Sequence, residues 1–288
     1  MRYQRLSTGD QYRLIAVDDE TTYDLTAVKP RLDGFGELAA AADIASCGID
    51  ELASEITAEA PTVSRDTLTD GTLPVVPEEV WAAGVTYEIS EEAREAESGM
   101  PEMYLHAYEA ERPEIFFKAT PSRTVGPGEA VGIRADSTWD VPEPELGIVL
   151  YDGSIVGYTI GNDMSSREIE GENPLYLPQA KMYERCCSIG PCIASAEAVG
   201  DPNELSMSMQ ITRDDEVLYD GETSIGNMAR SCEELVDYWR DHDVVPELGV
   251  LLTGTSLVPD DGFTLQPDDE VHIAIDEIGE LSNPVIEV

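Results

Sequence analysis

The sequence predicts an α+β protein in which a small α+β domain precedes a larger, β-rich domain. The chain has 288 residues, which is enough for one small and one large domain. Short apolar runs typical of strands dominate the region after residue 113, where helical patterns are few. Several turn-forming residues between positions 63 and 77 indicate a linker. We therefore expect domains at residues 1–75 and 76–288.

The first domain is expected to contain two strands and a helix. Residues 13–17 and 22–26 have the composition of paired strands. Residues 38–44 are rich in alanine, which favours a short helix. After the linker, residues 81–87 begin an ordered segment, and residues 91–97 are predicted to form a solvent-facing helix.

The second domain is predicted to be a β-rich core crossed by a few helices. Its expected strands cover residues 115–118, 130–134, 141–150, 155–160, 205–212 and 270–275. The clearest helical pattern covers residues 232–240.

Acidic residues dominate the composition. The chain carries 59 acidic and 17 basic residues, for a net charge of -42. This charge excludes DNA, RNA and anionic membranes as partners, because phosphate binding needs a basic surface. The acid is spread over the whole length, and molar salt shortens the screening distance to about 3 Å. The composition therefore predicts a protein of a halophile.

The cysteines predict an intracellular protein without disulfide bonds. Their spacing follows no disulfide framework and no paired zinc motif, so we expect reduced, mostly buried thiols at Cys47, Cys186, Cys187, Cys192 and Cys232. The sequence has no apolar signal core and no run of membrane-spanning length. We expect a soluble, cytoplasmic protein.

Two glutamates stand at the entrance of an otherwise apolar strand. Glu143 and Glu145 point to one face, because strand side chains alternate. The apolar run behind them makes their burial costly unless a cation lies between them. The next strand ends by delivering Asp163. Three carboxylates without a softer ligand suit Mg²⁺ first, and Mn²⁺ or Ca²⁺ next.

An alternative interpretation follows from the acidity itself. In a chain with 59 acidic residues, Glu-x-Glu also arises by chance on a solvated surface. The protein would then be an acidic calcium- or partner-binding module and not an enzyme. The apolar residues beside Glu143 and Glu145 argue against a solvated surface.

Five blocks of sequence resemble the fumarylacetoacetate hydrolase superfamily. They are Glu143-x-Glu145-Leu, residues 157–167, Ala180-Lys181, Gly190-Pro191 and residues 252–255. The resemblance spans roughly residues 80–288. It implies a mixed β-roll catalytic domain behind a smaller N-terminal domain, one Mg²⁺ per site and a homo-oligomer, either a dimer or a tetramer.

Within that superfamily, the closer likeness is to dehydratases of 2-keto-3-deoxy-pentonates, especially those acting on the D-arabinonate-derived acid. Residues 81–88, 112–121 and 172–181 carry it. It implies a small sugar-acid substrate and a Mg²⁺-dependent lyase reaction that forms 2,5-dioxopentanoate. The alternatives on the same scaffold are an acylpyruvate hydrolase and an oxaloacetate decarboxylase. The configuration of the substrate at C4 stays open.

One departure from the superfamily pattern favours dehydration. Hydrolases and decarboxylases of the superfamily carry a histidine where this chain has residues 86–90, which contain none. His242 and His272 are interpreted as structural, and His106 stays a weak candidate. Without a histidine to activate water, C–C hydrolysis loses its usual general base. Dehydration needs no attacking water.

Three residues are expected to carry the chemistry. Lys181 is the leading acid–base residue, because burial near a metal is expected to lower the pKa of a lysine. Lys118, at the end of an apolar strand, is expected to bind the substrate carboxylate or to stabilise the enolate. Glu114 begins that strand and is expected to handle the proton of the C4 hydroxyl, with a solvated role as the alternative.

Three further residues are expected to bind the substrate or to support the site. Thr255 resembles the family's binder of the substrate carboxylate. Arg167 follows Asp163 by four residues, and an ion pair with a metal-site carboxylate is favoured over direct catalysis. Tyr87, together with Glu88, is expected to form part of a lid over the substrate.

Overall fold

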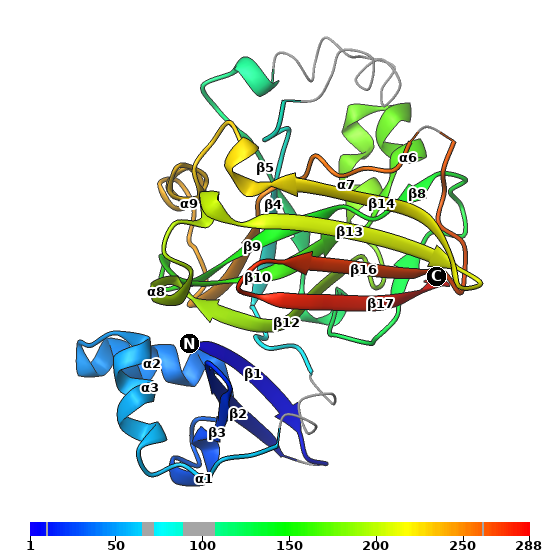
Figure 1. Cartoon of the computed structure of the whole chain (residues 1–288). Helices are drawn as coiled ribbons and strands as arrows, with labels where there is room; N and C mark the ends of the chain where they lie inside the picture. Colours follow the sequence, from blue (N-terminus) through cyan, green and yellow to red (C-terminus); the bar gives the residue numbers. More distant parts are fainter. Residues whose placement is uncertain (10, 65–71, 89–106, 261) are drawn as a thin grey trace.

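The protein is α+β and rich in strands, as the sequence predicts (Figure 1). The computed structural model describes residues 1–9, 11–64, 72–88, 107–260 and 262–288. Its largest sheet has ten strands in the order β3-β2-β1-β12-β10-β9-β15-β4-β5, with β6 paired to β12. A five-stranded sheet has the order β14-β13-β16-β17-β7, and β8 pairs with β11.

The N-terminal strands belong to the largest sheet. The elements here are β1 (Arg2–Ser7), β2 (Tyr12–Asp18), β3 (Thr21–Asp24), α1 (Leu25–Val28), α2 (Phe35–Ala45) and α3 (Ile49–Thr57). Strand β1 pairs with β2 on one side and with β12 on the other. The first 60 residues therefore share a sheet with the rest of the chain, and the division near residue 75 stays a prediction.

The predicted strand at 13–17 and helix at 38–44 are confirmed, and the strand at 22–26 is correct only in its first part. The chain leaves the strand at Asp24, whose carboxylate accepts a hydrogen bond of 3.0 Å from the amide of Ala27. This cap starts helix α1 and turns residues 25 and 26 away from the sheet.

The remaining strands of the largest sheet carry the functional side chains. They are β4 (Glu79–Gly84), β5 (Glu114–Ala119), β6 (Thr124–Val125), β9 (Pro144–Tyr151), β10 (Ser154–Asp163), β12 (Cys187–Ser195) and β15 (Leu248–Leu252). Short helices follow β10, namely α6 (Arg167–Glu172), η3 (Pro174–Tyr176) and α7 (Leu177–Lys181). The predicted strands at 115–118, 141–150 and 155–160 are confirmed within a few residues.

The second sheet lies in front of β9 and β10 in Figure 1. Its strands are β7 (Val131–Ile133), β13 (Ser206–Arg213), β14 (Glu216–Ser224), β16 (Glu270–Ile275) and β17 (Gly279–Glu287). Alternate residues of β13 and β16 are buried, which is the period-two pattern of a strand with one face on the core. The strand predicted at 270–275 and the helix predicted at 232–240, α9 (Cys232–Arg240), have the predicted bounds.

The remaining elements are short: β8 (Asp140–Val141), β11 (Ser165–Ser166), α8 (Ala196–Val199), η2 (Pro121–Arg123), η4 (Pro202–Glu204) and η5 (Ile225–Asn227). The helix predicted at 91–97 lies outside the described residues. All five cysteines are free thiols and four are buried, as predicted. Among the described helices, none combines the length and the apolar character that a membrane crossing needs.

Close packing of β9, β10 and β15 builds the floor of the site. A Cβ atom added at Gly161 would lie 2.3 Å from Cδ2 of Leu252, and one added at Gly147 would lie 2.9 Å from Cγ2 of Thr159. The two glycines therefore leave room for larger neighbours on the adjoining strands. This approach brings the loop that follows Leu252 next to the carboxylates of β9.

Candidate active site

Three buried carboxylates meet where β9 begins and β10 ends. Glu143 immediately precedes β9, Glu145 lies in β9 and Asp163 is the last residue of β10. One oxygen from each lies within 4.8 Å of the other two. The amide of Asp163 donates to the carbonyl of Glu143 at 2.9 Å, and the amide of Glu143 donates to Oδ1 of Asn162 at 3.2 Å. The hairpin thus holds the three side chains of the predicted metal site together.

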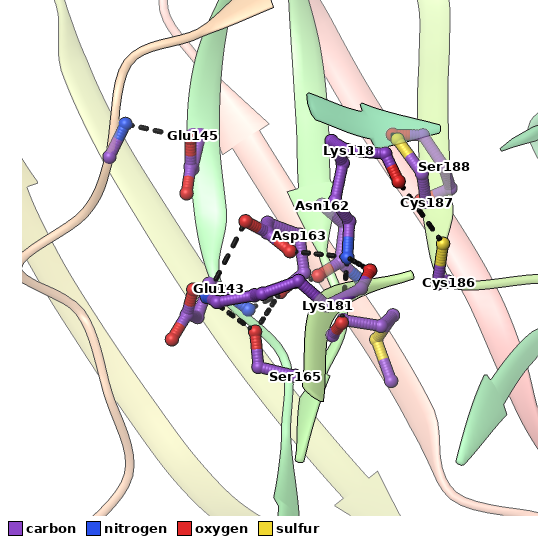
Figure 2. Close-up of polar contacts among 12 residues, drawn as sticks. Lys118, Glu143, Glu145, Asn162, Asp163, Ser165, Lys181, Cys186, Cys187 and Ser188 are labelled. Atoms are coloured by element: carbon purple, nitrogen blue, oxygen red, sulfur yellow. Dashed lines mark hydrogen bonds and ion pairs between the residues drawn. The ribbon is translucent and has the colours of Figure 1, made fainter. Parts of the chain in front are cut away.

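Lys181, the last residue of α7, donates into this cluster (Figure 2). Its ammonium group donates to Oε2 of Glu143, to Oγ of Ser165 at 2.7 Å and to Oδ2 of Asp163 at 3.5 Å. Burial lowers the pKa of Lys181, but the carboxylates of Asp163 and Glu143 raise it more, so the pKa lies well above its ordinary value. Two carboxylates thus outweigh burial at this lysine, and the lowered pKa expected for a lysine beside a bound metal stays a prediction.

Arg167 and Lys181 flank Glu143 from two sides. Nη2 of Arg167 lies 2.8 Å from Oε1 of Glu143, so the predicted ion pair with a site carboxylate is present. Burial raises the pKa of Glu143, yet Lys181 and Arg167 outweigh burial and lower it to about 2. Arg167 begins helix α6, which Ser166 caps by accepting a hydrogen bond from the amide of Ile169. Glu143 is therefore a stable carboxylate.

Lys118, on β5, lies behind Asp163 and does not line the pocket over the site. Its Nζ is 2.5 Å from Oδ1 of Asp163, and it donates to the carbonyls of Met164, at 2.9 Å, and Lys181. The side chain is fully buried. Three acceptors thus surround the ammonium group, which ties β5 to the end of β10 and to α7.

Glu145 is the one carboxylate of the three that forms no ion pair with the described residues. It is buried and accepts one hydrogen bond, of 2.7 Å, from the amide of Gly254. None of the ion pairs found among the described residues includes it. Burial, Asp163 and Glu143 together raise the pKa of Glu145 well above its ordinary value. A divalent cation would supply the missing positive charge, and three hard oxygen donors are the ligands that Mg²⁺ takes.

The pocket above the carboxylates is formed by both acidic and apolar residues. Its lining comprises Ala83, Gly84, Val85, Glu114, Phe116, Glu143, Glu145, Asp163, Arg167, Glu170, Leu177, Lys181, Gly254 and Thr255. Glu170 was missed by the sequence analysis. It follows Arg167 by three residues on α6, and that helical spacing places two side chains on one face.

Glu114 lines the pocket from the first position of β5. Burial raises its pKa to about 7, and Glu170 contributes the largest further increase, whereas Lys181 lowers it. A carboxyl group with this pKa exists in both protonation states near neutral pH. That property is what proton transfer in both directions requires.

Thr255 and Tyr87 occupy different places in the site. Thr255 lines the pocket, and its Oγ1 accepts a hydrogen bond of 3.0 Å from the amide of Leu257, which leaves the hydroxyl proton available to a ligand. Tyr87 is buried outside the lining, and its hydroxyl has no hydrogen-bond partner in the part of the chain that the structure describes. Glu88 is exposed, and His106 lies outside the described residues.

Comparisons with known proteins show the family and the fold of the chain. The family described as fumarylacetoacetate (FAA) hydrolase C-terminal matches residues 79–286. A probable 2-keto-3-deoxyxylonate dehydratase of Haloferax volcanii is 60% identical, with 100% of each chain covered. A 2-dehydro-3-deoxy-D-arabinonate dehydratase of Saccharolobus solfataricus is 43% identical, with 74% of each chain covered. The solved structure of 2-keto-3-deoxy-D-arabinonate dehydratase complexed with magnesium and 2,5-dioxopentanoate has a TM-score of 0.85 and 34% identity, covering 100% of this chain and 99% of that chain.

Replacing Glu145 should separate fold stability from metal binding. We expect Glu145→Gln to unfold in EDTA at the wild-type temperature or above it, because an amide keeps the acceptor for Gly254 and removes a buried, unpaired acid. Saturating Mg²⁺ should raise the melting temperature of the wild type but not of the variant; occupancy at 100 times Kd is worth about 2.7 kcal/mol. Thermal unfolding with Mg²⁺ and with EDTA measures both effects. Glu20→Gln, the same charge change at an exposed turn, is the control and should respond to Mg²⁺ as the wild type does.

Glu114 should reduce stability as the pH rises. Its pKa of about 7 in the folded chain exceeds its ordinary 4.5, so the unfolded chain releases this proton first. The resulting loss of folding stability is absent below pH 4.5, grows up to pH 7 and is constant above it. Glu114→Gln should therefore be more stable than the wild type at pH 8, by roughly 1–3 kcal/mol, and equally stable at pH 4.5. Denaturant unfolding across this range measures the difference, and a difference that does not change with pH contradicts the assigned pKa.

Proposed function

The chain belongs to the fumarylacetoacetate hydrolase family, and from this we propose that it is a Mg²⁺-dependent dehydratase of 2-keto-3-deoxy-pentonates. It converts such an acid to 2,5-dioxopentanoate and water. The observation that carries the proposal is a pocket in which a buried carboxylate triad, a buried lysine and a carboxyl group titrating near pH 7 meet. Relatives named as dehydratases of these acids support the choice of substrate.

Glu143, Glu145 and Asp163 are the proposed magnesium ligands. When bound, Mg²⁺ supplies Lewis-acid stabilisation of the negative charge that develops at the keto group, and compensates the carboxylates that raise the pKa of Lys181. The uncompensated Glu145 is the structural feature that fits this charge. Mn²⁺ and Ca²⁺ satisfy the same oxygen donors.

Lys181 is the proposed acid–base residue at C3. It lines the pocket, and its ammonium group is held by Glu143 and Ser165. Ser165 fixes the direction of the side chain without adding charge, so the lysine stays aligned in either protonation state. Removal of a C3 proton and its later return both need such a fixed group.

Glu114 is the proposed acid at C4. Its pKa of about 7 means that a large fraction is protonated at neutral pH and can donate to the leaving hydroxyl group, which departs as water. The resulting carboxylate then accepts a proton during the tautomerisation through C5 that produces the aldehyde. Lys181 and Glu114 therefore have different proton affinities, as two successive proton transfers require.

The remaining residues are proposed to bind or to position. Thr255 offers its hydroxyl proton to the substrate carboxylate. Arg167 orients Glu143, and Lys118 orients Asp163 from behind the pocket. We assign Lys118 this supporting role in preference to substrate contact, because three protein acceptors already surround its ammonium group. The role expected for Tyr87, as part of a lid over the substrate, stays a prediction.

The alternative reactions on this scaffold receive less support. Hydrolysis of an acylpyruvate needs an activated water, and no histidine lines the pocket among the described residues. His242 is exposed, and Nδ1 of His272 lies 2.8 Å from Oγ of Ser282, far from the carboxylates in sequence and on the second sheet. Oxaloacetate decarboxylation would use the triad but would leave Glu114 without a hydroxyl group to protonate.

The physiological setting is also part of the proposal. A net charge of -42 and a full-length relative in Haloferax volcanii support a halophilic protein that works in the cytoplasm. Its partner is a small sugar acid and not a nucleic acid or a membrane, because the chain offers too few basic residues for phosphate surfaces. The assembly we propose is a homo-oligomer.

Turnover of a 2-keto-3-deoxy-pentonate tests the function. In multimolar KCl with Mg²⁺ we expect 2,5-dioxopentanoate to form, no product with EDTA and no cleavage of an acylpyruvate assayed in parallel. Lys181→Met should lower kcat by about 10²- to 10⁴-fold, the usual contribution of a general acid–base group. Lys29→Met, at an exposed position, is the matched control and should keep wild-type kcat. Cleavage of the acylpyruvate alone would reject the dehydratase assignment.

Salt should control stability as well as activity. Raising KCl from 0.2 M to 3 M should raise the melting temperature by many degrees, because screening weakens repulsion among 59 acidic residues. Thermal unfolding at constant Mg²⁺ measures this dependence. Equal melting temperature and equal turnover at both salt concentrations would contradict a halophilic origin.

A further inference from the structure

Gly84 and Glu114 face one another across two strands. They are paired positions in the antiparallel ladder of β4 and β5, and both line the pocket. A Cβ atom added at Gly84 would lie 2.1 Å from Oε2 of Glu114 and 2.9 Å from its Cδ. The carboxyl group of Glu114 therefore lies directly over the α-carbon of Gly84, in space that any other residue would fill with its side chain.

The backbone does not explain why position 84 is glycine. Gly84 is not among the residues with a positive φ, so another residue could adopt its conformation. The next residue, Val85, does have a positive φ of 54° although it is β-branched, so this turn does not reserve its left-handed position for glycine. What glycine contributes at position 84 is the missing methyl group.

We propose that Gly84 is a positioning residue for proton transfer: the space over its α-carbon holds the Glu114 carboxyl group inside the pocket. This rests on the proposed function in so far as Glu114 is the acid at C4. A side chain at position 84 would push the carboxyl group out of that space. The atoms in the way are the far end of a flexible side chain, so the displacement costs the fold little while it moves the acid.

The surroundings of Glu114 make its position consequential. The charged groups that act on it are Glu170 of α6, Lys181 of α7, Glu143 before β9 and Asp163 at the end of β10. Three of these four are carboxylates, which favour the protonated form of Glu114. A displaced carboxyl group would lose its alignment with the pocket. It would also be less affected by the three carboxylates that favour its protonated form.

A double-mutant cycle tests the proposal. Gly84→Ala should lower kcat roughly 10- to 100-fold, because misplacement by about 1 Å costs on the order of 10²-fold. Glu114→Gln should lower kcat at least as much, and the double variant should be no slower than Glu114→Gln alone, since no acid remains to be misplaced. The proposal would be overturned if the double variant lost kcat by the product of the two single losses, or if Gly84→Ala kept the wild-type kcat.

Gly221→Ala is the matched control. Gly221 also lies on a strand, in β14, and a Cβ atom there would meet the outer end of another side chain, 2.5 Å from the hydroxyl oxygen of Tyr219. That variant carries the same glycine-to-alanine change in a strand outside the pocket. We expect wild-type kcat from it, and a loss as large as that of Gly84→Ala would show that the effect is not specific to Glu114.

A readout without substrate separates this proposal from the proposed function. With glycine at position 84, the difference in free energy of unfolding between the wild type and Glu114→Gln should grow from pH 4.5 to pH 7. With alanine at position 84, the same difference between the forms without and with Glu114→Gln should grow less. An unchanged pH dependence in Gly84→Ala would overturn the positioning role even if the enzyme is active. Absence of turnover in the wild type would reject the dehydratase function and leave this measurement valid.

Discussion

The burial of three carboxylates is the constraint on which the rest of the site depends. An ion withdrawn from water costs several kcal/mol unless opposite charge and hydrogen bonds replace its hydration. Glu143 and Asp163 obtain that charge from Arg167, Lys181 and Lys118, and their geometry is fixed accordingly. Within the described part of the chain, the only hydrogen bond that Glu145 accepts comes from the amide of Gly254. Two of the three carboxylates therefore have cationic side chains beside them, and the third does not. A divalent ion would supply the positive charge that the third carboxylate lacks.

The sheet meets this constraint by bringing distant segments to one point. Strands β9 and β10 form a hairpin that carries all three carboxylates, and β5 and α7 supply the two lysines. Strand β15 contributes the loop with Gly254, and its Leu252 packs against Gly161 of the hairpin. Lys118 bonds to the carbonyl of Lys181, so the two cations are also connected through the backbone. Displacement of one of these strands would therefore alter several charges together.

Acidic residues in this chain perform two separate physical tasks. Most of the 59 acids give the molecule its large negative charge, which high salt screens. A few are buried, and the pKa of a buried carboxyl group depends on its neighbours. Two cations lower the pKa of Glu143 to about 2. Burial and nearby carboxylates raise the pKa of Glu114 to about 7. The chemistry proposed for the pocket follows from this contrast, since it needs one acid that always stays ionised and another that exchanges its proton.

The sequence alone determined the class of fold, the carboxylate triad proposed to bind magnesium, and the family. Strand alternation places Glu143 and Glu145 on one face, and such local periodicity does not depend on the rest of the chain. It also identified Lys181, but not the two carboxylates that outweigh burial there and raise its pKa. Only the tertiary structure decided that Lys118 lies behind Asp163, that Glu170 joins the pocket and that Glu114 rests over Gly84. These relations join residues up to tens of positions apart, and sequence spacing carries no information about which strands become neighbours.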